Sequence, residues 1–142
     1  MLQLLRVEGQ LPEDFPALRA EAEAEGHRNM ARLAAEMAST PDMFTVVLAA
    51  FEGGELVGIG GVTREPTDPS VQRMRRLFVA RRARRLGIAR SIANGLLAEA
   101  LQHAKTVTAH AGNAGAARFW EAMGFTPVAD RAWSHVFDPA SH

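Results

Sequence analysis

Runs of branched and aromatic apolar residues divide the first half of the chain, and turn-forming residues bound each run. The runs at 2–7 and 44–51 each predict a strand. The tetrapeptide EGGE then supplies a turn, and LVGIGGVTR at 56–64 follows as the second strand of a predicted hairpin. Residues 12–39 show a helical pattern with a break expected at Gly26. This half therefore predicts a strand, one or two helices, and a hairpin.

A third long strand is predicted at 71–80, VQRMRRLFVA, after a loop EPTDPS at 65–70. Strict alternation along this strand divides its side chains between two faces. One face takes Met74, Arg76 and Phe78, and the other takes Arg73, Arg75, Leu77 and Val79. The strand is expected to continue the hairpin into a sheet.

From Gly87 the apolar spacing changes to that of a helix. A strand at 105–111, a short helix at 115–124, and two last strands at 125–129 and 132–137 complete the pattern. The order predicts a mixed α/β (α+β) fold with a largely antiparallel central sheet flanked by helices. No linker, repeat or low-complexity tract interrupts it, so one domain is expected over residues 1–142.

Composition agrees with a single globular domain, because 142 residues that are 47% hydrophobic can bury a core. The chain has no cysteine, and its five histidines show no close metal-ligand spacing, so no metal is expected. The start lacks the features of a signal peptide, and no apolar run approaches a membrane span. The sequence therefore predicts a cytoplasmic protein without membrane partners.

Positive charge gathers in one stretch of a chain whose net charge is zero. Eight of its basic residues lie between Arg73 and Arg90. The segment RRARRLGIARS at 81–91 falls at a strand-to-helix junction, where free backbone N–H groups and the helix dipole favour an anion. Gly87 allows close backbone approach to a phosphate, and the arginines add donors. A solvated charged face and a nucleic-acid patch are the alternatives.

Two blocks of the sequence resemble the Gcn5-related N-acetyltransferase (GNAT) family. The segment LFVARRARRLGIARSIANGLLAEA is similar to the motif R/Q-x-x-G-x-G/A that opens a helix after a strand, with Arg84, Gly87 and Ala89 at the signature positions. NAGAARFWEAMGF is similar to a second family block, and the matching residues are Asn113, Ala116, Phe119, Gly124 and Phe125. The blocks occur in the family's order, and the resemblance is weakest over residues 1–45.

The resemblance implies a fold with a splay between strands 4 and 5, and acetyl-CoA as cosubstrate. In this family the pyrophosphate lies on the backbone amides of the motif, which here belong to Arg84, Arg85, Leu86, Gly87, Ile88, Ala89 and Arg90. The pantetheine arm lies between the strand ending Leu77, Phe78 and Val79 and the strand at 105–111. A main-chain N–H near Leu77 or Phe78 then polarises the thioester carbonyl. Asn113 is expected to bond the arm, and Phe119 to pack near it.

Two departures from the family concern the chemistry. Many members carry a tyrosine after the position of Phe119, where it protonates the departing thiolate, but this chain has no tyrosine and holds Trp120 there. An indole N–H donates a hydrogen bond without releasing its proton near neutral pH. Trp120 is therefore expected to steady a thiolate and not to act as a general acid.

The family's usual general base is also missing. Members often place a glutamate at positions that hold Arg73 and Thr108 here. Counting by twos from Thr108 brings His110 to the same face, where a neutral imidazole is able to accept a proton. A structural histidine at a strand end is the alternative.

Three classes of function follow. The first is an N-acetyltransferase that moves an acetyl group from acetyl-CoA to a primary amine, of a small molecule or a peptide, by direct attack in a ternary complex. The second is a non-catalytic acyl-CoA binding or sensing module. Nucleic-acid binding ranks last, because no aromatic residues alternate with the arginines. The acceptor, the acyl length and a homodimer are left open, although the acidic residues Glu21, Glu23 and Glu25 suggest a cationic acceptor or simply a solvated helix.

Overall fold

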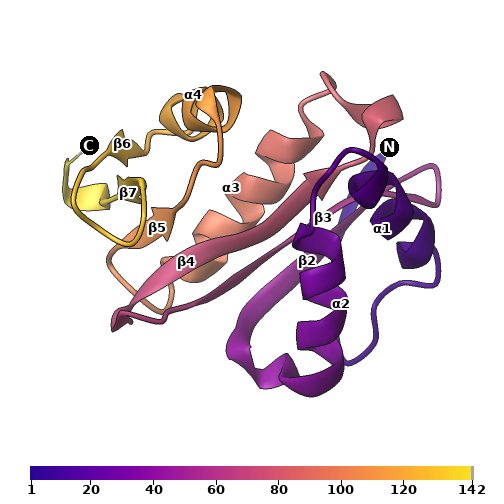
Figure 1. The fold of residues 1–142 in the computed structure, drawn as a ribbon, viewed down its shortest axis with the longest axis horizontal. Coiled ribbons are helices and arrows are strands. Elements are labelled where there is room, and N and C mark those ends of the chain that lie inside the picture. Colours follow the sequence, from indigo (N-terminus) through magenta and orange to yellow (C-terminus); the bar gives the residue numbers. More distant parts are fainter. Residues whose placement is uncertain (142) are drawn as a thin grey trace.

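The computed structural model describes residues 1–141, and Figure 1 shows a sheet with helices on both faces. The helices are α1 (Phe15–Ala24), α2 (Asn29–Ser39), α3 (Ile88–Ala100) and α4 (Ala114–Ala122), with short 3-10 turns at Pro41–Met43, Arg81–Ala83 and Pro139–Ser141. The strands are β1 (Leu2–Arg6), β2 (Phe44–Glu52), β3 (Glu55–Glu65), β4 (Asp68–Val79), β5 (Val107–Ala109), β6 (Thr126–Pro127) and β7 (His135–Phe137). The predicted element order is confirmed, and the first helical segment divides at Gly26, whose φ is 84°.

The strands of the described residues form one sheet in the order β1-β2-β3-β4-β5-β7-β6. Every neighbouring pair is antiparallel except β4 and β5, which run parallel. This arrangement confirms the predicted mixed, largely antiparallel sheet. The single parallel pair lies at the centre of the order, where the chain crosses from β4 through α3 to β5.

Two apolar cores hold the layers together. On one face α3 packs Ile92, Ala93 and Leu96 against the sheet, and each is fully buried. On the other face α1 and α2 contribute a second cluster that includes Met30 and Leu33. Burial of each isoleucine, leucine or methionine side chain among them contributes about 1.5–3 kcal/mol, so the two helical layers fix the central strands between them.

The predicted loop at 65–70 is wrong at both ends. β3 continues to Glu65 and β4 begins at Asp68, so only residues 66 and 67 join the two strands. The polar and proline-rich composition of EPTDPS suggested a longer loop. In the structure Glu65 is instead 1% exposed, because its carboxylate finds partners on neighbouring strands.

The predicted alternation along β4 is also wrong. Register with β3 passes from the pair Gly61 and Arg75 to the pair Ile59 and Phe78, so two residues of β4 oppose one of β3. This β-bulge shifts the alternation by one residue. Met74 therefore packs on the α3 side, while Phe78, expected on the same face, packs with α1 and α2.

The C-terminal strands are shorter than the sequence pattern suggested. The strand expected at 105–111 is reduced to β5, so His110 lies just beyond its end. The last two strands, expected at 125–129 and 132–137, are reduced to β6 and β7. The sheet therefore has two halves, β1 to β4 and β5 to β7. They meet only where the short strand β5 pairs with β4, and beyond this pairing the two halves are separated.

Candidate functional site

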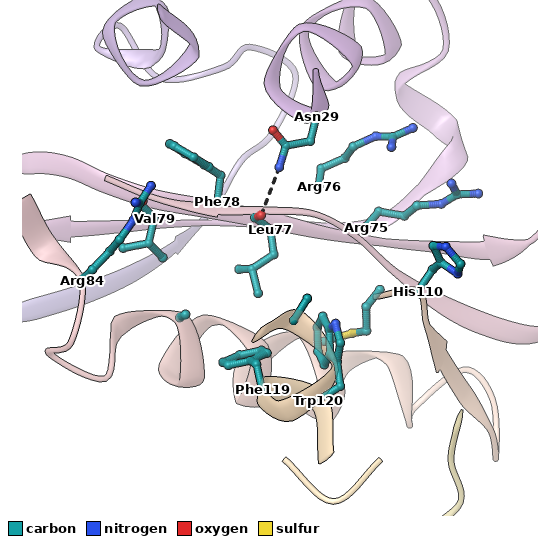
Figure 2. Close-up of a pocket in the computed structure, with 13 residues that line it drawn as sticks. Asn29, Arg75, Arg76, Leu77, Phe78, Val79, Arg84, His110, Phe119 and Trp120 are labelled. Carbon is teal, nitrogen blue, oxygen red and sulfur yellow. Dashed lines mark hydrogen bonds between the residues drawn. The ribbon is translucent and has the colours of Figure 1, made fainter. Parts of the chain in front are cut away.

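A cleft opens along β4 where the sheet divides. β4 and β5 pair only at Gln72 with Val107 and at Arg73 with Thr108. From Met74 to Val79, β4 has no strand partner on its β5 side within the described residues. A pocket of about 440 Å³ occupies this splay. Figure 2 shows the unpaired part of β4 on one side and α4 on the other.

The bulge in β4 lies in the middle of this cleft. Arg76 has a φ of 57°, which is unusual for a residue with a side chain. Its guanidinium binds Glu36 of α2 through two hydrogen bonds of 2.9 and 2.6 Å, and both side chains are mostly buried. Opposite the bulge, a Cβ at Gly60 would lie 2.9 Å from Leu96 and 3.2 Å from Leu77. The ion pair therefore holds the strained backbone in place. The absence of a side chain at Gly60 leaves room for the side chains of Leu77 and Leu96 beside it.

Asn29, the first residue of α2, reaches the same part of the cleft. Its Nδ2 donates a hydrogen bond of 3.2 Å to the carbonyl oxygen of Leu77, as Figure 2 shows. Its Oδ1 is buried and has no hydrogen-bond partner among the described residues. Unsatisfied buried acceptors are rare and often mark functional sites. Asn29 therefore fixes the bulged backbone from the α2 side and leaves one acceptor unused.

The other end of the cleft leads to a concave run of backbone N–H groups. Gly87 lies just before α3 with a φ of 77°, and Arg85 has a φ of 67°. Within the described part of the chain, the N–H groups of residues 85–90 meet no backbone acceptor. Such a turn at the start of a helix collects partial positive charge. The backbone here is suited to a phosphate or another anion.

The guanidinium of Arg84 lines the cleft and already has partners within the protein. It was expected to donate to a phosphate, but Nη2 lies 2.6 Å from Glu25 and Nε donates to the carbonyl of Val79 at 3.1 Å. It also lies 5.4 Å from the centre of the Phe78 ring. The hydrogen bond from Arg84 lowers the pKa of Glu25 below its ordinary value. Arg84 thus ties the motif to the C-terminal end of α1.

The remaining residues of the motif differ in the exposure of their side chains. Arg85, Leu86 and Arg90 are exposed, and the side chain of Ile88 is buried in the core. Ala89 lines the cleft, as do Leu77, Phe78 and Val79 of β4. The side chain of Ile88 therefore anchors α3 in the core.

The second sequence block forms α4 and the facing wall of the cleft. Asn113 caps this helix, because its Oδ1 accepts a hydrogen bond of 2.8 Å from the N–H of Ala116. The sequence predicted a hydrogen bond from this side chain to the pantetheine arm. Because Oδ1 is used by the helix cap, the Nδ2 group is the part of the side chain available for such a bond. Asn113 does not line the cleft, whereas Phe119 and Trp120 do.

Trp120 lies mostly in the apolar core, and part of its side chain lines the cleft. Its residue is 7% exposed, and its ring packs against Phe119 at 4.9 Å and Phe125 at 5.1 Å between centroids. Its Nε1 makes no hydrogen bond within the described residues, and it is not among their buried unsatisfied atoms. In Figure 2 the indole nitrogen is on the side of the ring that faces β4. The indole N–H therefore has access to the cleft.

His110 lines the cleft at the end away from Arg84, as Figure 2 shows. It is exposed and forms no hydrogen bond within residues 1–141. An imidazole in this position is free to meet a molecule in the cleft. The sequence argument therefore placed His110 in the cleft although it missed that β5 ends one residue earlier.

Sequence reasoning missed a buried carboxylate close to the expected position of the base. Glu65 accepts hydrogen bonds from Thr108 at 3.1 Å and from Arg73 at 3.4 Å. The resemblance implied a glutamate at one of these two positions, but here the carboxylate comes from β3. Glu65 does not line the cleft, and its side chain is fully buried in the ion pair with Arg73. This carboxylate therefore holds β3, β4 and β5 together at the point where the splay begins.

Asn29 and Arg75 also line the cleft and were not singled out from the sequence. A helical amide before the apolar pattern of α2 carries no distinctive signal. The face expected for Arg75 precedes the bulge, but alternation alone does not indicate that this face lines a cleft.

The described residues contain neither a candidate metal centre nor a helix that could span a membrane. No group of three or more histidine, cysteine, aspartate or glutamate side chains is arranged to hold a metal ion. None of the helices described is both long enough and apolar enough to cross a membrane.

Comparison with known proteins identifies the family. The acetyltransferase (GNAT) domain family matches residues 16–135. A comparison with curated proteins finds no match. Among solved structures, a proposed acetyltransferase from Exiguobacterium sp. 255-15 is 19% identical with a TM-score of 0.86, covering 99% of this chain and 95% of the other. A proposed GNAT acetyltransferase from Desulfovibrio desulfuricans is 18% identical with a TM-score of 0.74, covering 97% and 99%.

Ard1 from Thermoplasma volcanium is similar as well, with 17% identity, a TM-score of 0.68, and coverage of 95% of this chain and 93% of the other. At such identities the likeness to solved structures establishes the fold. The domain match extends over most of the sequence and includes both motif blocks. The chain therefore belongs to the GNAT acetyltransferase family.

Proposed function

We propose that the protein transfers an acetyl group from acetyl-CoA to a primary amine. The observation that carries this proposal is that the cleft runs along the unpaired edge of β4 as far as Arg84 and Ala89, next to the backbone N–H groups of residues 85–90 that have no backbone acceptor. An unpaired strand edge offers alternating donors and acceptors to an extended amide-containing chain. The turn before α3 offers donors to a phosphate.

The residues present fit coenzyme A at both places. Gly87 has a positive φ and open space where a Cβ would lie, so no side chain stands between this turn and a phosphate. Val79 and Leu77 supply the unpaired edge, and Ala89 and Phe119 supply apolar contact. The thioester would supply the activated acetyl group. Arg84 supports this site by holding the turn against α1.

The chemistry requires a neutral amine, a polarised carbonyl and a departing thiolate. The neutral amine nitrogen forms a bond to the carbonyl carbon and thereby becomes positively charged. The carbon–sulfur bond breaks, coenzyme A departs as the thiolate, and the nitrogen loses one proton to give the neutral amide. We assign the proton acceptor to His110, directly or through a water molecule, because it lines the cleft and has no other partner among the described residues. We assign the polarising donor to a main-chain N–H near the bulge at Leu77 or Phe78.

The indole N–H of Trp120 is the donor that we assign to the thiolate. It reaches the cleft, but its proton is not transferable near neutral pH. A thiolate is a tolerable leaving group because ordinary thiols have a pKa of about 8.5. Turnover without a general acid is therefore feasible and slower.

A non-catalytic acyl-CoA binding module is the second candidate. It is favoured by two observations: Trp120 replaces a titratable hydroxyl, and the buried carboxylate of Glu65 is committed to Arg73. Both candidates use the same cleft and differ in whether an acceptor amine reacts there.

The two candidates separate in one assay. The protein is incubated with acetyl-CoA and a panel of amines, and both free thiol and acetylated amine are measured. We expect thiol release that depends on the amine and equals the acetylated product. Thermal stabilisation by acetyl-CoA without any acetylated amine would favour the binding module.

A further inference from the structure

Three neighbouring arginines of β4 differ in whether a carboxylate pairs with their positive charge. Arg73 pairs with Glu65 at 3.4 Å, and Arg76 pairs with Glu36 at 2.6 Å. Arg75 has no ion pair within residues 1–141, and its Nε donates to the hydroxyl of Thr63 at 3.2 Å. Its two terminal nitrogens have no hydrogen-bond acceptor there and are not sealed from solvent. Arg75 therefore presents an unmatched guanidinium.

The surroundings of Arg75 favour a negatively charged partner. Burial lowers the pKa of this guanidinium, and the positive charges of Arg73 and Arg76 add to the effect, while Glu65 and Glu36 oppose it less strongly. A half-buried cation beside two others is costly unless an anion joins it. A planar guanidinium binds a carboxylate or phosphate through two parallel hydrogen bonds.

The position of Arg75 connects two cavities. It lines the cleft of about 440 Å³ and also a second pocket of about 730 Å³ that lies between the 3-10 turn at Pro41–Met43 and the β3–β4 turn. In Figure 2, Arg75 and His110 lie at one end of the cleft and Arg84 at the other. The second pocket therefore adjoins the end of the cleft that the turn before α3 does not occupy.

The charge of the second pocket is mostly positive. Arg64 and Arg75 line it together with His103, and Asp42 is the one carboxylate among its described lining residues. Of the acidic residues at the C-terminal end of α1, two pair with arginines, and the third accepts a hydrogen bond from a backbone N–H. Glu21 accepts from the N–H of Arg81, Glu23 from Arg19, and Glu25 from Arg84.

We propose that the acceptor is an amine that carries a carboxylate or phosphate group, and that Arg75 binds this anionic group in the second pocket. The amine of the same molecule then extends into the cleft toward His110. This inference rests on the proposed acetyl transfer and adds the chemical class of the acceptor. It replaces the cationic acceptor that the acidic first helix suggested.

Matched acceptors test the proposal. Amino acids are compared with their carboxamides, and O-phosphoethanolamine is compared with ethanolamine, in wild type, Arg75→Gln, Arg75→Lys and Arg32→Gln. Arg32 is exposed on α2 outside both pockets and serves as the control. Acetyl transfer is measured as kcat/KM. Stabilisation by each amine in the presence of free coenzyme A is measured separately as a shift in Tm.

We expect wild type and Arg32→Gln to prefer one anionic series over its neutral partner by at least about tenfold, since a hydrogen-bonded charge is worth roughly 1.5–3 kcal/mol. Arg75→Gln should lose more activity on the anionic amines than on the neutral ones, so that the preference disappears, and Arg75→Lys should lie in between. The preferred series decides between carboxylate and phosphate.

Failure of this inference is distinct from failure of the proposed function. Equal rates on anionic and neutral amines, or an equal loss on both in Arg75→Gln, would overturn the acceptor class while acetyl transfer stands. Stabilisation by anionic amines that depends on Arg75 without any transfer would preserve the anion site and overturn the enzyme. The absence of both transfer and stabilisation dependent on Arg75 would overturn both.

Discussion

The two ends of the cleft offer positive charge in different ways. Before α3, six successive residues offer backbone N–H groups, and the nearby side chain of Arg84 is neutralised by Glu25. At the other end the backbone is held by the bulge, and the available charge is the side chain of Arg75. One end therefore depends on backbone conformation and the other on a single guanidinium.

This difference separates two properties of the site. A backbone cradle tolerates many side chains but requires particular dihedral angles, as at Gly87 with its φ of 77°. A single side chain is removed by one substitution without altering the backbone. Cofactor binding should therefore be sensitive to backbone changes near α3, and chemistry and acceptor choice to side-chain changes near His110.

The largest effect is expected from Gly87→Val. A Cβ at this positive φ strains the turn and blocks close approach of a phosphate. The variant should lose most of the rise in Tm that coenzyme A gives, which corresponds to roughly 2.7 kcal/mol at a ligand concentration of 100 Kd. Gly9→Val is the matched control, since Gly9 has a φ of 83° and equally open surroundings. An undiminished shift in Gly87→Val would refute the cradle.

His110→Gln should show the opposite pattern. The coenzyme A shift in Tm should persist, while kcat falls about 100-fold, the lower end of the usual contribution of a general base. His27→Gln is the control, because His27 is exposed and does not line the cleft. If kcat is unchanged in His110→Gln, the proton leaves the amine by another route.

Substitution of Trp120 should have a smaller effect on turnover. Trp120→Tyr places a titratable hydroxyl near the cleft and should raise kcat about tenfold if protonation of the thiolate limits the rate. Trp120→Phe removes the N–H and should leave coenzyme A binding nearly intact, with some loss of stability from its contacts with Phe119 and Phe125. A Trp120→Tyr enzyme no faster than wild type would show that leaving-group protonation is not limiting.

The smallest effect concerns the ion pair that supports the turn. The pKa of Glu25 is lowered in the folded protein, chiefly by Arg84, so the pair stabilises the fold above the ordinary pKa of 4.5 and loses this contribution as the pH falls through the folded value. In Arg84→Gln, urea midpoints should fall less between about pH 7 and pH 3 than in wild type. Arg82→Gln, which removes a more exposed pair with Glu55, is the comparison. An equal change of the urea midpoint with pH in wild type, Arg84→Gln and Arg82→Gln would show that Arg84 does not lower the pKa of Glu25.

The sequence predicted the parts of the site that depend on local backbone pattern. Gly87 before an amphipathic run indicated the turn and the start of α3, and the spacing of the second block indicated α4 with Gly124 after it, whose φ is 98°. These features are local, since a glycine at positive φ and a helical apolar stripe both appear within a few residues.

The parts that the sequence did not predict depend on contacts between distant residues. The bulge at Arg76 is held by Glu36, which is 40 residues away in the sequence. No local sequence pattern predicts this bulge. Burial of Glu65 depends on Thr108, which is 43 residues away. The ion pairs of Arg73 and Arg76 likewise join residues distant in the sequence, so alternation along β4 does not indicate that Arg75 is the one of the three without an ion pair within residues 1–141.

The most direct test of the central claim is to follow the backbone amides while coenzyme A is added to the labelled protein. If the cleft along β4 holds the cofactor, NMR amide resonances of residues 85–90 and of the unpaired β4 edge at 74–79 should shift together with one dissociation constant. Gly87→Val should abolish both sets of shifts, and Gly9→Val should leave them in place. Shifts that avoid these two segments, or no shifts at saturating coenzyme A, would contradict the account.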